Sequence, residues 1–197
     1  MTIARHREGE APAEPKPLPS RRHPIHGVIT DGHEPIIIFL TVCTKDRQSW
    51  LASPGVHDLL RDMWANASAW FVGRYVIMPD HIHLFAAPNP TWEGKAPAAP
   101  MPYREGKPNP NAAQRELRPP GEPPLFDAWV RYWKSQFTKH HRVPNHHWQP
   151  DHWERRLRRE ENYAEKWEYV WHNPVRKGLV ARAEDWPYQG ELKELPW

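Results

Sequence analysis

Two histidines separated by one residue, His81 and His83, are the side chains of this sequence best placed to bind a metal ion. The flanking residues 74–78 and 81–87 are rich in apolar and β-branched residues and predict two strands. Side chains alternate between the two faces of a strand, so both imidazoles should lie on one face. Neighbouring imidazoles on one face are a ready pair of ligands for a divalent cation.

A second pair of functional side chains, Tyr169 and Asn173, lies in a later segment with helical spacing. Residues four apart stack on one face of a helix. A phenol is a poor nucleophile until its proton is removed or its target is polarised. A divalent cation held by the two histidines and Asn173 would polarise a nearby phosphodiester. The phenol of Tyr169 could then attack phosphorus, leaving a covalent phosphotyrosine and a free hydroxyl.

The elements around the histidines follow from the hydrophobic pattern. Residues 36–43 form a continuous run of apolar, mostly β-branched side chains, which predicts a strand buried on both faces. Residues 56–71 have apolar side chains at helical spacing, and Gly73 is expected to end that helix. Pro79 and Asp80 are expected to form the tight turn between the two strands.

The second half of the chain predicts two more helices, over 125–143 and 159–173, with a short extended piece at 146–153. Pro174 prevents the last helix from continuing. The first of these helices is basic and amphipathic, so it either lines a phosphate backbone or exposes a solvated charged face. Its predicted DNA-binding residues are Arg131, Lys134, Lys139 and Arg142.

Composition predicts one domain, over 34–190, with appendages. Residues 1–33 are expected to be a disordered arm, 88–124 a disordered insertion that holds eleven of the 24 prolines, and 191–197 a tail. The net charge of +3 is a weak indication of a polyanionic partner. A single cysteine and the lack of a long apolar run favour a cytoplasmic protein without a membrane span.

Residues 78–84 resemble the His-hydrophobic-His motif of the single-strand transposases that use one catalytic tyrosine. The block 167–180, together with 148–150 and 185–188, is similar to the REP-associated tyrosine transposases. The resemblance spans about residues 35–190. It implies an α+β fold of the HUH endonuclease and transposase type. In that fold a ferredoxin-like antiparallel sheet carries the histidines and helices pack on it.

The resemblance also implies a metal-dependent DNA strand transferase. Such an enzyme cleaves and rejoins single-stranded DNA through a 5′-phosphotyrosine, here at repetitive palindromic hairpins, with Mg²⁺ or Mn²⁺ as cofactor. His81 and His83 match the metal-binding pair, Tyr169 the nucleophile and Asn173 the third ligand, where relatives place Gln or His. Tyr163 is the second choice of nucleophile and is expected to be a core residue. The resemblance leaves open whether the protein is a monomer or a dimer.

Two other functions fit the same residues. A domesticated transposase would keep the fold and bind structured single strands without cutting them. An unrelated metal hydrolase would use the histidine pair with water as the nucleophile, and its activity would not depend on Tyr169.

Overall fold

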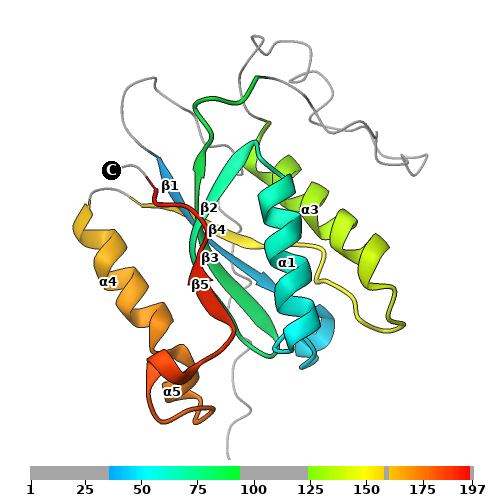
Figure 1. Cartoon of the computed structure of the whole chain (residues 1–197), viewed down its shortest axis with the longest axis vertical. Helices are drawn as coiled ribbons and strands as arrows, with labels where there is room; N and C mark the ends of the chain where they lie inside the picture. The colour runs from blue at the N-terminus through cyan, green and yellow to red at the C-terminus, as the bar shows by residue number, and fades with distance from the viewer. Residues whose placement is uncertain (1–35, 94–123, 158–159, 196–197) are drawn as a thin grey trace, which may run out of the picture.

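The structure, a computed structural model, describes residues 36–93, 124–157 and 160–195 and shows a five-stranded antiparallel sheet with helices on both faces (Figure 1). The strands are β1 (Ile37–Cys43), β2 (Trp70–Ile77), β3 (His81–Pro88), β4 (Trp153–Leu157) and β5 (Gln189–Glu191). Their order across the sheet is β4-β1-β3-β2-β5. The predicted α+β class is confirmed, with both histidines on the middle strand. The predicted arm and most of the predicted insertion lie outside the described residues.

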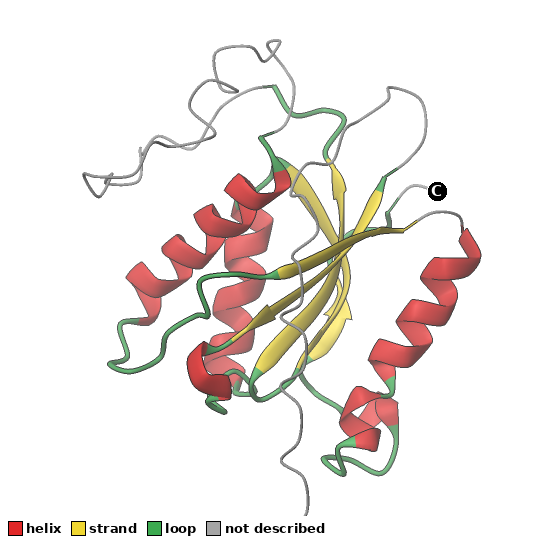
Figure 2. Cartoon of the chain, turned by 180° about the vertical axis from the view of Figure 1, so that it is seen from behind, coloured by secondary structure: helices red, strands yellow, loops and turns green. Residues whose placement is uncertain are grey.

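Helices cover the two faces of the sheet unequally. The helices are α1 (Pro54–Asn66), α3 (Phe126–His141), α4 (Glu160–Trp171) and the short α5 (Asn173–Arg176), with 3₁₀ turns at Lys45–Arg47 and Ala183–Asp185. Figure 2 shows α1 and α3 together on one side of the sheet, and α4 with α5 on the other. Among the described helices, none is long and apolar enough to cross a membrane.

The alternation of side chains along β1 and β3 divides the core into two layers. Leu40 and Leu84 point to the layer of α1 and α3, which holds most of the large buried side chains. Phe39 and Phe85 point to the layer of α4, which is a smaller cluster. Because His81 and His83 share the parity of Phe85 along β3, they belong to the α4 face of the sheet.

The first predicted helix ends earlier than expected. Helix α1 stops at Asn66, and Trp70 and Phe71 already belong to β2. The apolar spacing continues past Asn66 because the next buried residues face the same layer from a strand. Gly73 therefore does not end the helix: it lies inside β2, where a Cβ would sit 2.6 Å from the Leu195 side chain.

Two edge strands were not predicted from the sequence. The extended piece expected at 146–153 is followed by β4, which pairs with β1 along one edge of the sheet. Strand β4 has the sequence Trp-Glu-Arg-Arg-Leu, and such charged side chains are typical of an edge strand. Because the strand has no apolar run, the hydrophobic pattern of the sequence does not indicate it. At the other edge the three residues of β5 pair with β2.

Candidate metal and nucleophile site

Strand β3 places the two histidine rings beside each other on the α4 face. Their ring centroids lie 4.7 Å apart with an interplanar angle of 81°. Across the ladder to β1, His81 is opposite Cys43 and His83 is opposite Thr41. The predicted placement of both imidazoles on one face is confirmed.

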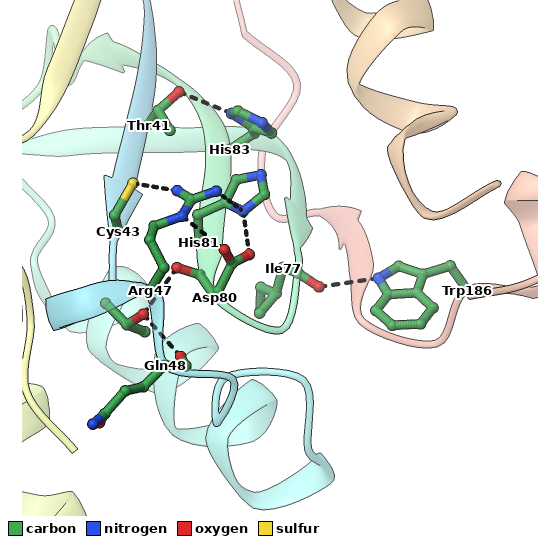
Figure 3. A network of polar contacts seen from close by, with 10 residues as sticks. Thr41, Cys43, Arg47, Gln48, Ile77, Asp80, His81, His83 and Trp186 are labelled. Carbon is green, nitrogen blue, oxygen red and sulfur yellow. Dashed lines mark hydrogen bonds and ion pairs between the residues drawn. The ribbon is translucent and has the colours of Figure 1, made fainter. Parts of the chain in front are cut away.

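Each imidazole has a hydrogen-bond partner at Nδ1, as Figure 3 shows. Asp80 Oδ1 lies 2.7 Å from His81 Nδ1, and Thr41 Oγ1 lies 2.8 Å from His83 Nδ1. Because a carboxylate only accepts, His81 donates from Nδ1 and keeps a lone pair on Nε2. Among the described residues, none hydrogen-bonds either Nε2 atom. Both rings can therefore present Nε2 to a metal ion, with the Nδ1 partners fixing their orientation.

The environment keeps both imidazoles neutral. Burial lowers the pKa of His81, although the hydrogen bond to Asp80 opposes the shift. Burial is also the main cause that lowers the pKa of His83 to about 3. Repulsion from His81, when it is protonated, and from Arg47, Lys166 and Arg176 lowers this pKa further. Neutral imidazole is the form that binds metal ions, so the pair is prepared for a divalent cation at neutral pH.

Backbone hydrogen bonds hold the turn before His81. The backbone N–H and the hydroxyl of the buried Thr44 both donate to the Asp80 carbonyl, at 3.0 and 3.1 Å. Across the turn, Met78 N–H donates to the His81 carbonyl at 2.8 Å. These hydrogen bonds hold the backbone of Asp80 in place, and with it the position from which its carboxylate reaches His81.

Arg47 is a residue of this site that sequence reasoning missed. It lies in a 3₁₀ turn where both Asp46 and Arg47 have positive φ, 55° and 56°, an uncommon conformation for side chains with a Cβ. Its Nε pairs with Asp80 Oδ2 at 2.7 Å, and its Nη1 donates to Cys43 Sγ at 2.8 Å. Its Nη2 lies 3.5 Å from His81 Nδ1. A basic residue in a polar connection between two elements is common, so the sequence gives no indication that Arg47 contacts Asp80 and His81. These contacts become visible only in the folded structure.

The predicted nucleophile lies on the same side of the sheet, on an exposed part of α4. Tyr169 is 57% exposed, so its phenol is not aimed into the core. The Lys166 ammonium lies 5.6 Å from the Tyr169 ring centroid and 5.4 Å from that of Phe39. Phe39 in turn stacks on His83 with centroids 5.3 Å apart. Among the described residues, no hydrogen bond or ring contact joins Tyr169 directly to either imidazole.

Asn173, the predicted third ligand, is the first residue of α5 and is 8% exposed. Its Oδ1 accepts a hydrogen bond from Arg176 Nη2 at 2.5 Å. The positive charges of Lys166 and Arg176 also contribute to the low pKa of His83, so α4 and α5 bring them into the electrostatic range of the pair.

Tyr163, the second choice of nucleophile, packs as expected. Its ring meets Phe85 edge-on with centroids 4.7 Å apart, in the smaller core layer. Burial raises its pKa to about 12, which makes it a still poorer source of phenolate.

The basic residues predicted to bind DNA are not beside the histidines, because α3 covers the opposite face of the sheet (Figure 2). Arg131 forms an ion pair with Asp127 at 2.6 Å. Lys139 and Arg142 are exposed near the C-terminal end of α3. Lys134 is only 8% exposed, and its ammonium donates to the carbonyls of Gln149 and Pro150 at 2.7 and 3.2 Å. Lys134 therefore holds the following loop, and we exclude it from the proposed DNA contacts.

The donor set fits a divalent cation. Two neighbouring neutral imidazoles from β3 are able to bind a divalent cation, and Asp80 and Thr41 fix the orientation of the two rings through their Nδ1 atoms. A cation held there could polarise a phosphodiester, and the Tyr169 phenol is exposed on α4, on the same side of the sheet.

Comparisons with known proteins bear on the family and the fold of the chain. No protein-family model matches the chain. It is 36% identical over 157 residues to the REP-associated tyrosine transposase of Escherichia coli (strain K12), covering 76% of this chain and 73% of that protein. Among solved structures, one of a REP-associated tyrosine transposase bound to a REP hairpin has a TM-score of 0.55 and 24% identity. That similarity covers 78% of this chain and 74% of the other, and it supports the fold.

Proposed function

Because this chain belongs to the REP-associated tyrosine transposases, we propose that it cleaves and rejoins single-stranded DNA at repetitive palindromic hairpins, with Tyr169 as nucleophile. The observation that carries the proposal is the histidine pair on the face that α4 covers, where two neutral rings have no hydrogen-bond partner at Nε2 among the residues that the structure describes. The exposed phenol of Tyr169 lies on that same helix.

The proposed residues have separate roles. His81, His83 and Asn173 would hold Mg²⁺ or Mn²⁺, and when bound the cation would withdraw negative charge from the scissile phosphate. Asp80 and Thr41 keep the imidazoles oriented. These five side chains come from β1, the turn before β3, β3 itself and α5.

The covalent step is a transesterification. The Tyr169 phenol loses its proton and its oxygen bonds to phosphorus, while the bond from phosphorus to the 3′ oxygen of the preceding nucleotide breaks. That oxygen takes up a proton and leaves as a free 3′-hydroxyl. Rejoining is the reverse reaction with a 3′-hydroxyl as the attacking group, so the step needs no external energy source.

The DNA would contact both sides of the sheet. Lys166 and Arg47 lie next to the proposed cleavage site. We propose that the strand carrying the scissile phosphate passes these residues. The exposed Arg131, Lys139 and Arg142 on α3 remain proposed contacts for the hairpin stem beyond it.

The decisive experiment uses a labelled single-stranded DNA hairpin with Mn²⁺, followed by a denaturing gel. The wild-type protein should form a covalent adduct, and Tyr169→Phe should form none while its hairpin affinity stays near normal, because only the phenolic oxygen is removed. Tyr163→Phe, on the same helix, is the matched control and should retain the adduct.

The same gel separates the other two functions. A domesticated binding protein would bind the hairpin but give no adduct even as wild type. A water-dependent hydrolase would still cut the DNA in Tyr169→Phe, and persistent cutting or adduct in that variant would refute the assignment of the nucleophile.

A further inference from the structure

Arg176 touches both of the functional residues of α4 and α5. Its Nη2 donates to Asn173 Oδ1 and to the backbone carbonyl of Tyr169. Its guanidinium carbon also lies 4.0 Å from the centroid of the Tyr169 ring, in a cation–π contact. One side chain therefore links the proposed nucleophile to the proposed third ligand.

The contact at Asn173 has a chemical consequence for metal binding. The Asn173 carboxamide is buried, and the oxygen that a cation would need is already accepting a charge-assisted hydrogen bond. A guanidinium and a divalent cation on the same oxygen would repel each other at short range. The cation and Arg176 are thus competitors for one atom.

We propose that Arg176 is a positioning residue that ties the Tyr169 ring to Asn173, and that a divalent cation bound by the histidine pair must displace it from Asn173 Oδ1. The inference rests on the proposed function, since it takes Asn173 as a ligand and Tyr169 as the nucleophile. In this arrangement the cation takes the place of Arg176 at Asn173 Oδ1, while the guanidinium stays stacked on the Tyr169 ring.

A purely structural role for Arg176 makes a different prediction. Basic side chains near the end of a helix often hydrogen-bond its last carbonyls, and Tyr169 is in the last turn of α4. A residue that only stabilises the helix end would lower the thermal stability when replaced. It would not increase the affinity of the protein for a metal ion.

The test measures the affinity for Mn²⁺ alone, without DNA, by isothermal titration calorimetry and by the electron paramagnetic resonance signal of free Mn²⁺. Arg176→Ala should bind Mn²⁺ about tenfold more tightly, because the competing charge-assisted hydrogen bond is gone. Arg176→Gln, which keeps much of the stem, should show the same increase and guards against misfolding of the alanine variant. At saturating Mn²⁺ both variants should form the DNA adduct more slowly, since Tyr169 loses its stacked partner.

A double-mutant cycle shows whether Arg176 acts through Asn173. In an Asn173→Ala background, Arg176→Ala should leave the Mn²⁺ affinity unchanged, because the shared oxygen is absent. Lys177→Ala is the control for charge, since Lys177 also lies near the site and contributes to the low pKa of His81. It should increase the affinity far less than Arg176→Ala.

Three results would overturn the inference: unchanged Mn²⁺ affinity in both Arg176 variants, additive effects in the double variant, or an equal increase in Lys177→Ala. His83→Ala distinguishes this failure from failure of the proposed function. If His83→Ala loses Mn²⁺ binding while the Arg176 variants bind as wild type, only the role of Arg176 is wrong. If His83→Ala binds Mn²⁺ normally, the proposed metal site itself is wrong.

Discussion

At the scale of single residues, the site depends on the hydrogen-bond partners of the Nδ1 atoms of two imidazoles. His81 and His83 would be ordinary half-polar residues of a strand if their rings could rotate freely. Asp80 and Thr41 fix the rings, and Arg47 fixes Asp80 in turn. The motif visible in the sequence is therefore supported by two residues outside it, Thr41 and Arg47.

The low pKa of His83 predicts a pH dependence of stability. Below pH ~6.5 the unfolded imidazole binds a proton, whereas the folded one does so only near pH 3, so the metal-free protein loses stability as the pH falls. The loss is at most about 1.4 kcal/mol per pH unit for this histidine. Urea unfolding between pH 6.5 and 5.5 should show a steeper loss for wild type than for His83→Asn, whose amide can still reach Thr41. Parallel curves for the two proteins would contradict the assigned pKa.

At the scale of elements, helix α3 serves the core more than the surface. Five of its buried side chains are apolar and face the sheet together with α1, and Lys134 is the exception among its buried residues. Burial lowers the pKa of the Lys134 ammonium to about 8, yet two backbone carbonyls accept its hydrogen bonds. The helix thereby holds the loop that leads into β4.

Replacing Lys134 should affect folding and not DNA binding. Lys134→Met leaves the carbonyls of Gln149 and Pro150 without their donor and should cost about 2 kcal/mol of unfolding free energy. Lys139→Met, one turn further along and exposed, is the matched control and should change stability by less than about 0.5 kcal/mol. Chemical denaturation gives both values, and a loss of hairpin affinity without a loss of stability in Lys134→Met would show that the lysine contacts DNA after all.

The sequence predicted the elements wherever a hydrophobic period was strong. The buried run of β1 and the alternation of β3 were recognisable, and so were the helical spacings of α1, α3 and α4. The edge strands β4 and β5 were not recognisable, because an edge strand buries little apolar surface and does not need alternating apolar side chains. The end of α1 was also misplaced, since apolar spacing does not report when the chain leaves a helix to join a strand of the same layer.

For the site, sequence alone could place the two histidines on one face of a strand but could not identify the residues around them. The face shared by His81 and His83 follows from the period of a strand. The positions of Arg47 and Arg176 depend on turns and on the docking of α5, and no period encodes these. Nor could the basic residues of α3 be assigned to a face of the sheet before the strand order was known.

At the scale of the whole molecule, the sheet separates two basic surfaces. Lys166, with Arg176 and Lys177, lies on the side of the histidines, whereas Arg131, Lys139 and Arg142 belong to the helix on the other side (Figure 1). A short strand that spans only the cleavage site can reach the first surface. A hairpin with a stem is large enough to reach both.

Salt dependence separates the two surfaces. Lys166→Met should reduce the slope of log affinity against log salt by about 0.7 for a short single strand, since one phosphate contact is lost. Lys139→Met should leave the slope for the short strand unchanged and reduce it only for the full hairpin. Fluorescence anisotropy at several salt concentrations measures each slope, and a change for the short strand in Lys139→Met would place the cleaved strand on the α3 side.

The position of the ligand pair on the middle strand restricts how this site can change. Ile82 and Leu84 alternate with the histidines and are wholly buried against α1 and α3. One residue inserted or deleted at the β2–β3 turn would shift the strand pairing by one place and exchange the two sets of side chains. Imidazoles would enter the apolar layer, and isoleucine and leucine would take the places of the two histidines, so folding and the proposed metal binding would be lost together. Diversity among related enzymes is therefore expected in the helices and loops around this strand, while its length stays fixed.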